Sequence, residues 1–143
     1  MKIADVMRSR GTTQVITVAP TDTVTHLLAV LAEHRIGAVV VSPDGRKVEG
    51  IVSERDIVRR LHDRGASVLD APVSEVMTTE VRTCTAETRI PQVAALMTEH
   101  RIRHLPVLQG EDLYSIVSIG DVVKFRMDQL QAERDHLESY ITQ

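Results

Sequence analysis

The chain contains 143 residues, carries a formal net charge of −3 and is 43% hydrophobic, with one cysteine, two tyrosines and one phenylalanine. This length suits one domain or two halves that stabilise each other, because a piece of about 60 residues is marginal alone. The mild negative charge and the scarcity of aromatic rings exclude the usual modes of nucleic-acid and anionic-membrane binding. We expect no disulfide, no signal peptide, no membrane span and a cytoplasmic location.

The first half of the chain predicts a β-α-β-β-α order, preceded by a short helix. Thr21 or Asp22 is a capping signal, and the apolar residues at 24, 27, 28 and 31 that follow share one helix face. This helix ends at the His-Arg-Ile sequence that finishes at Ile36. The short helix is predicted at 3–7, the strands at 14–18, 38–41 and 48–52, and the last helix at 56–61, after a possible N-cap at Ser53.

The second half repeats this pattern. Glu-His-Arg-Ile at 33–36 recurs at 99–102, and Ile-Val-Ser-x-x-Asp-x-Val at 51–58 recurs at 116–123. Two copies are too few for a solenoid, so they predict one pseudo-symmetric unit with paired ligand sites. The repeat predicts helices at 73–77, from 90 to the second His-Arg-Ile, and from 121, with strands at 81–84, 104–108 and 113–117. The predicted boundaries are 1–62 for the first repeat, 63–72 for a linker, 73–126 for the second repeat and 127–143 for a C-terminal helix.

The C-terminal segment has no counterpart in the first repeat. Met127, Leu130, Leu137 and Ile141 recur among charged residues, interrupted by Arg134. This spacing predicts an amphipathic helix of about four turns, continuous with the helix before it. Packing on its own domain and contact with a second copy are equally compatible with the pattern.

These motifs resemble a tandem pair of cystathionine-β-synthase (CBS) domains, also called a Bateman module, over about residues 1–126. Gly-Ile-Val-Ser-Glu-Arg-Asp at 50–56 matches the signature that closes each repeat in that family, and Ser-Ile-Val-Ser-Ile-Gly-Asp at 115–121 departs from it only at Ser115. The resemblance implies an α/β (α+β) fold. Two pseudo-symmetric β-α-β-β-α repeats would pack sheet to sheet, followed by the C-terminal amphipathic helix, and copies would associate as homodimers.

The resemblance also implies two clefts that bind adenosine compounds. A carboxylate at a helix start can accept hydrogen bonds from both ribose hydroxyls, a role for Asp56 and Asp121. Hydroxyl and backbone N–H groups at the same turns suit ribose or phosphate oxygens. Because arginine can hold phosphate with two parallel bonds, Arg103 favours the Asp56 cleft as the phosphate site. With Asp121 and Ser118 the resemblance groups Thr12, Gln14, Val15, Ile16, Thr17, Ile36, Gly37 and Ala38; with Asp56, Ser53 and Arg55 it groups Thr78, Val81, Arg82, Thr83, Ile102, Arg103, His104 and Pro106.

Simpler interpretations exist for several of these residues. The serines and aspartates of the two signatures also suit plain helix capping, and Arg103 also suits a solvated surface position. Cys84 replaces Val18 of the first copy and is predicted to be a core residue. His100 and His104 are four residues apart, but the predicted helix ends between them, so we expect no zinc site.

The predicted function is a non-catalytic regulatory or sensory module that binds AMP, ADP or ATP between its two repeats. No nucleophile–base pair or phosphate-binding glycine motif indicates an enzyme. No cofactor is required, and NAD or S-adenosylmethionine is the alternative ligand. A ligand-free structural adaptor that uses its C-terminal helix is the alternative from another class. The expected partners are the nucleotide, a second copy and an unidentified regulated protein.

Overall fold

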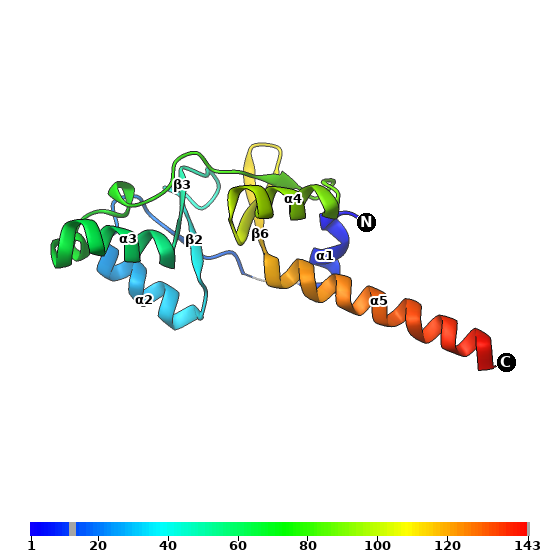
Figure 1. The fold of residues 1–143 in the computed structure, drawn as a ribbon. Coiled ribbons are helices and arrows are strands. Elements are labelled where there is room, and N and C mark those ends of the chain that lie inside the picture. Colours follow the sequence, from blue (N-terminus) through cyan, green and yellow to red (C-terminus); the bar gives the residue numbers. More distant parts are fainter. Residues whose placement is uncertain (12–13, 143) are drawn as a thin grey trace.

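The computed structural model, which describes residues 1–11 and 14–142, contains two similar halves of mixed α/β structure (Figure 1). Each half has a three-stranded sheet, with strand orders β1-β2-β3 and β4-β5-β6. In both sheets the first strand runs parallel to the second, and the third runs antiparallel to it. The predicted fold class is confirmed.

The first half follows the predicted order closely. Its middle helix is capped by Thr23, whose side chain accepts a hydrogen bond from the His26 N–H at 3.1 Å, so neither Thr21 nor Asp22 is the N-cap. The elements of this half are α1 (Ile3–Arg10), β1 (Thr17–Val18), α2 (Val24–His34), β2 (Ala38–Val41), β3 (Gly50–Ser53), α3 (Glu54–Arg64) and a 3₁₀ helix, η1 (Gly65–Asp70).

The second half repeats the order with a longer hairpin and a much longer last helix. Both middle helices end as the repeat predicts, at Arg35 and Arg101, which adopt the left-handed conformation with φ of 55° and 53°. The elements of this half are a 3₁₀ helix, η2 (Val73–Glu75), then β4 (Cys84–Thr85), α4 (Ile90–His100), β5 (His104–Gln109), β6 (Asp112–Ser118) and α5 (Ile119–Thr142).

The early strands are shorter than predicted, and the α-helix predicted at 73–77 is instead a 3₁₀ helix at Val73–Glu75. Backbone pairing across the repeats accounts for part of this difference. Thr78 and Ile51 exchange two N–H to C=O hydrogen bonds of 2.8 and 3.0 Å. The segment after η2 is therefore held against β3 of the first half, and it joins its own sheet only at Cys84.

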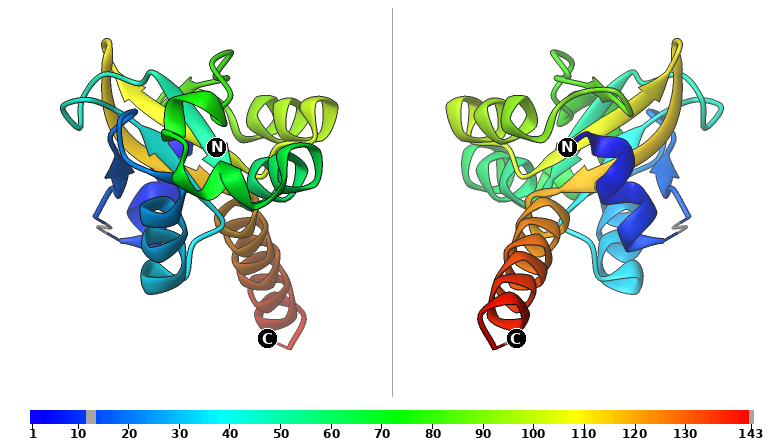
Figure 2. Two further views of the ribbon diagram at one scale, coloured as in Figure 1. Left: turned by 90° about the vertical axis from the view of Figure 1, so that its left-hand side faces the viewer. Right: turned by 90° about the vertical axis from the view of Figure 1, so that its right-hand side faces the viewer.

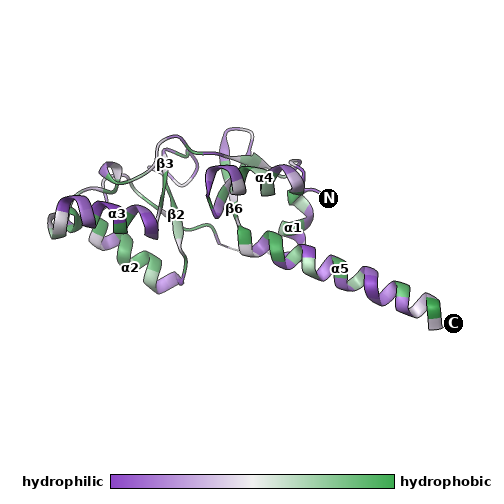
Figure 3. Cartoon of the chain, in the orientation of Figure 1, coloured by the Kyte–Doolittle hydropathy of each residue, from purple (hydrophilic) through white to green (hydrophobic). Residues whose placement is uncertain are grey.

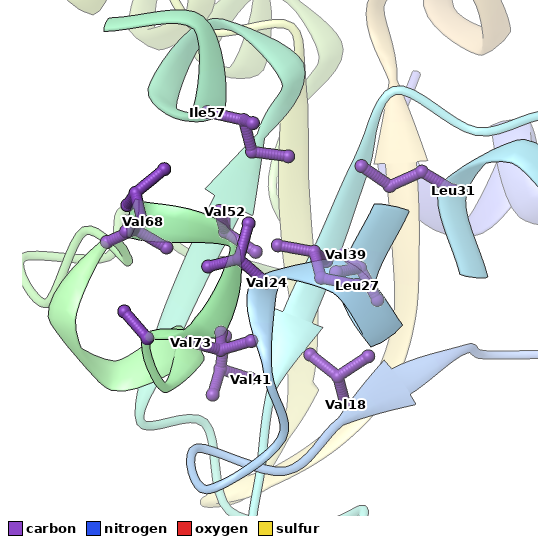
Figure 4. Close-up of a cluster of buried hydrophobic side chains, with 12 residues drawn as sticks. Val18, Val24, Leu27, Leu31, Val39, Val41, Val52, Ile57, Val68 and Val73 are labelled. Carbon is purple, nitrogen blue, oxygen red and sulfur yellow. The ribbon is translucent and has the colours of Figure 1, made fainter. Parts of the chain in front are cut away.

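Each half has its own core, and the segments that lead into the two repeats are exchanged between these cores. In the first core, Val68 of η1 and Val73 of η2 are fully buried among the side chains of α2, β2 and β3 (Figure 4). In the second core, Ile3 and Val6 of α1 pack with α4, β5 and β6. The predicted linker 63–72 thus contributes to the first core, η2 at the start of the second repeat packs into the first core, and α1 at the start of the first repeat packs into the second core.

The two sheets pack against each other through the faces that point away from these cores. Val39 and Val41 of β2 belong to the first core, so alternation along the strand directs Ala38 and Val40 to the opposite face. Val40 is nevertheless fully buried. A backbone hydrogen bond of 2.7 Å from the Leu113 N–H to the Arg46 C=O also joins the two halves. This packing brings the helix starts of the two repeats to a shared interface.

Helix α5 begins in the second half and then leaves the body of the protein. Val122 and the half-buried Phe125 pack into the second core, and the helix contacts α1 and α4 near its start. Figure 2 shows the rest of α5 projecting alone from the body, and Figure 3 shows hydrophobic residues recurring along it. The predicted continuity of the C-terminal helix with the last helix of the repeat is therefore correct.

Candidate functional site

The two Ser-x-x-Asp turns form matching capping boxes at the starts of α3 and α5. The Ser53 N–H donates to Asp56 Oδ2 at 2.8 Å, and the Ser118 N–H donates to Asp121 Oδ2 at 3.0 Å. In return, the Ser53 and Ser118 hydroxyls accept from the backbone N–H groups of the two aspartates at 3.4 and 3.1 Å. Within the described part of the chain, Oδ1 of neither aspartate accepts a hydrogen bond. Helix capping therefore leaves each carboxylate an oxygen for a ligand.

Asp121 has a cationic partner that the sequence analysis missed. The Arg10 guanidinium donates from Nη1 to Asp121 Oδ2 at 2.9 Å and to the Ile116 C=O at 2.7 Å, and from Nη2 to Ser115 Oγ at 2.9 Å. The side chains of Arg10 and Asp121 are only 18% and 25% exposed, so water screens this ion pair less than it would on an open surface. Helix α1 runs three residues past its predicted end and thereby places Arg10 at this turn.

The departure at Ser115 is explained by this arginine. In the first repeat, a Cβ at the corresponding Gly50 would lie 2.5 Å from Met77 Sδ and 3.0 Å from the Thr78 C=O, so any larger residue would require Met77 to move. In the second repeat, the Arg10 side chain takes the place of that backbone contact and donates a hydrogen bond to the Ser115 hydroxyl. The serine in the glycine position was the signal in the sequence that could have pointed to Arg10.

Gly37, Glu54 and His104 meet where the two repeats face each other. A Cβ built on Gly37 would lie 3.6 Å from His104 Cε1 and 3.8 Å from Glu54 Oε2. Burial lowers the pKa of His104, while the nearby carboxylates of Asp121 and Glu54 partly oppose this shift. A half-buried imidazole from the second repeat thus lies against the start of α3 in the first.

Backbone hydrogen bonds attach the segments after α2 and α4 to the helix starts of their own repeats. The Gly37 C=O accepts from the Glu54 N–H at 3.0 Å, and the Arg103 C=O accepts from the Ile119 N–H at 2.8 Å. Arg103 therefore has its backbone at the Asp121 turn. Its exposed side chain is the part that would have to reach the Asp56 cleft, and that assignment stays a prediction.

The structure brings some of the other predicted residues to these turns. Thr78 pairs with Ile51, two residues before Ser53. Thr17 pairs with Val40 in the first sheet, Pro106 pairs with Ile116 in the second, and Thr12 lies outside the described residues. Of the remaining candidates, the side chains of Gln14, Arg55 and Arg82 are exposed, whereas Val15, Ile16, Ile36, Val81, Thr83 and Ile102 are partly buried and Ala38 is buried.

The structure also contains open cavities that are lined by residues outside the two Ser-x-x-Asp turns. The larger, of about 890 Å³, separates α1 from the β5–β6 hairpin and has Arg10 and Ser115 in its wall. The smaller, of about 580 Å³, includes the predicted residues Val81 and Thr83 together with Lys47. Neither wall includes Ser53, Asp56, Ser118 or Asp121.

The remaining features concern metal binding, the single thiol and membrane spans. No three His, Cys, Asp or Glu side chains among residues 1–11 and 14–142 are grouped so as to hold a metal ion. Cys84 is buried in the second core, as predicted, and this burial raises the pKa of its thiol to about 11. In the same ranges, no helix has the length and apolar character needed to cross a membrane.

Comparison with known proteins agrees with this architecture. The CBS domain family model matches residues 3–63 and 73–128. A mitochondrial CBS domain-containing protein of Arabidopsis thaliana is 35% identical over 97% of this chain and 71% of its own. A CBS-domain protein from Agrobacterium tumefaciens is 38% identical, with a TM-score of 0.83 over 88% of this chain and 99% of that one. A CBS domain protein of Pyrobaculum aerophilum, solved in complex with AMP, is 24% identical, with a TM-score of 0.73 over 85% and 89%.

The fold and the two signature turns define a protein made of two paired repeats. The chain belongs to the CBS domain family and carries two copies of that domain. The resemblance noted in the sequence is thus confirmed. Proteins of paired CBS domains are generally regulatory, non-catalytic modules.

Proposed function

We propose that this protein is a regulatory module that binds adenine nucleotides at its two Ser-x-x-Asp turns. The observation that carries the proposal is the pair of matched capping boxes, each with one carboxylate oxygen left without a protein donor in the described structure. A cis-diol can donate two hydrogen bonds to such a carboxylate, and charge-assisted bonds of this kind are the strong ones. No cofactor is needed for this function.

The family comparison supports a ligand of this class. The Pyrobaculum aerophilum protein shares the fold, and its complex with AMP shows that the fold accommodates an adenine nucleotide. A CBS domain pair solved with 5′-methylthioadenosine and S-adenosyl-L-methionine has the same fold at 20% identity and a TM-score of 0.78. Adenosine is common to these ligands, whereas the group attached to it differs. S-Adenosylmethionine and NAD are therefore the alternatives to AMP, ADP and ATP.

The two turns are not equivalent as ligand sites. The Asp121 carboxylate already forms an ion pair with Arg10. Within the described residues Asp56 has no cationic partner, and its Oδ2 accepts only from Ser53. A ribose diol at Asp121 must share the carboxylate with a guanidinium, which weakens the charge it meets. We therefore propose that Asp56 forms the tighter ribose site, with Arg55 and Arg103 as its phosphate contacts.

Calorimetric titration with AMP, ADP, ATP, NAD and S-adenosylmethionine tests the proposal, with guanosine monophosphate as the control for the base. A bound ligand at about 100 times Kd adds roughly 2.7 kcal/mol to the free energy of unfolding. For a chain of this size, we expect the melting temperature to rise by several degrees, at roughly 2–8 °C per kcal/mol. Absence of binding by every adenosine compound at millimolar concentration would reject the proposal.

A structural adaptor is the second candidate function, and the exposed length of α5 favours it. Met127, Leu130 and Leu137 lie 65%, 53% and 60% exposed on that helix. An adaptor would keep its clefts empty and bind a regulated protein through α5. A homodimer and a cytoplasmic location also remain proposals for this chain.

A further inference from the structure

Helix α5 carries a second apolar stripe that is exposed in the described structure. Val122 and Phe125 face the core, whereas Val123, Met127 and Leu130 lie on the exposed side. The exposed stripe continues to Leu137 and Ile141. With Arg134 included, its positions are 123, 127, 130, 134, 137 and 141, which alternate by four and three residues. This alternation is the heptad spacing of a coiled-coil seam.

The charges beside this seam decide between a parallel and an antiparallel partner. In a parallel pair of identical helices, Arg134 would face Arg134 of the other copy, and Glu133 would lie beside the other Glu138. Both contacts bring like charges together. A parallel coiled coil of two copies is therefore disfavoured.

An antiparallel pair removes both of these like-charge contacts and introduces one at its centre, between the two Glu133 side chains. Aligning residue 127 with residue 137 of the other copy also places 123 against 141, and 130 against 134, so each Arg134 faces a leucine. Lys124 then lies beside Glu138 of the other copy, twice by symmetry. The two Glu133 side chains meet at the centre, where the two Arg134 guanidinium groups balance them.

We propose that two copies of this protein associate through an antiparallel coiled coil of α5 helices, with Val123, Met127, Leu130, Arg134, Leu137 and Ile141 as the seam. Lys124, Arg134 and Glu138 already form ion pairs within α5, but breaking those pairs costs little free energy. Lys124–Asp128 and Arg134–Glu138 are pairs within one helix with side chains at least 60% exposed, and such pairs contribute little. The association requires no nucleotide, so it stands apart from the proposed ligand function.

The first test exchanges the charges in the full-length protein. Lys124→Glu should weaken the dimer, because two cross-copy attractions become repulsions. Two surface pairs predict a loss of roughly 2- to 30-fold in the dimerisation constant. Glu138→Lys should weaken the dimer similarly, and the double variant should restore it. Sedimentation over a concentration series measures all four proteins. A double variant no better than the single ones would reject the antiparallel register, and a wild-type monomer at every concentration would reject the dimer.

The second test reads the orientation by disulfide formation. Met127→Cys and Leu137→Cys proteins, one carrying a mass tag, are mixed and oxidised. The antiparallel register predicts mixed disulfides between the two variants, well above the level formed by an exposed Val58→Cys control. Disulfides within each variant alone would show a parallel pair and overturn the proposal. The native Cys84 is buried in the second core and should not interfere.

Discussion

Asp56 and Asp121 occupy equivalent turns but differ in one contact, the Arg10 ion pair. If Asp56 holds the ribose, Asp56→Ala should weaken AMP, ATP and adenosine alike, because all three carry the diol. Hydrogen bonds to charged groups contribute about 1.5–3 kcal/mol, so the expected loss is roughly ten- to hundredfold. Titration calorimetry measures it. Asp56→Asn, which retains an oxygen for the Ser53 N–H, controls for lost helix capping, and full affinity in both variants would contradict the ribose role.

Replacing Arg103 should distinguish phosphate recognition from ribose recognition, because its side chain is proposed to contact only the phosphate. Arg103→Ala should weaken ATP and AMP by roughly tenfold or more while leaving adenosine nearly unchanged, since adenosine carries no phosphate. The same three titrations test this, with Arg101→Ala as the matched control from the end of α4. Equal losses for adenosine and ATP would mean that Arg103 does not contact phosphate.

Arg10 is expected to stabilise the fold as well as the turn. Arg10→Ala removes three hydrogen bonds, one of them to a carboxylate, and leaves the Ile116 C=O and Asp121 with fewer donors. We expect the free energy of unfolding to fall by about 1–3 kcal/mol. Urea denaturation provides the measurement. Arg8→Ala on the same helix, whose ion pair with Asp5 is exposed, should change stability by less than about 1 kcal/mol.

His104 predicts a pH dependence of stability. Because burial lowers its pKa below the usual value of about 6.5, the unfolded chain binds a proton more readily than the native protein does. Its contribution is therefore complete above about pH 6.5 and declines as the pH falls through that value. The loss of unfolding free energy between pH 7.5 and 5.5 should be smaller in His104→Gln than in the wild type. An identical loss in both proteins would contradict this assignment, and His136→Gln on the exposed part of α5 is the control.

At the scale of elements, α5 is the part that extends beyond the two repeats. Deleting residues 127–143 removes most of the exposed apolar stripe but leaves Val122 and Phe125, which anchor the helix in the second core. We therefore expect the truncated protein to lose self-association through α5 while it retains its fold and most of its affinity for an adenine nucleotide. Sedimentation and calorimetry on the same preparation separate the two properties. An unchanged dimer would place the interface on the body of the protein.

At the scale of the whole molecule, the exchanged segments make the two repeats depend on each other. Ile3 is fully buried in the second core although it begins the first repeat. Ile3→Ala should therefore cost about 2–5 kcal/mol of unfolding free energy, as buried isoleucine truncations do. Val58→Ala, at a residue 65% exposed on α3, should stay within about 0.5 kcal/mol. A cost near zero for Ile3→Ala would contradict the exchange.

The sequence alone determined the repeat, the element order and the two capping turns. These features depend on residues close together in the chain, such as the apolar stripe of α2 and the serine three residues before each aspartate. They also carried the resemblance to the CBS family. The predicted boundaries and the nucleotide-binding residues stay predictions.

Only the tertiary structure decided which segments pack together. The exchange of α1 and η2 between the two cores and the reach of Arg10 to Asp121 both join residues that lie far apart in the sequence. Apolar periodicity shows which face of a helix is buried but not what buries it, and a charged side chain near a helix end predicts no particular partner. Long-range packing decides both the surface that buries a helix face and the partner of a charged side chain. The free energy gained by burial depends on which surfaces come together in the folded protein.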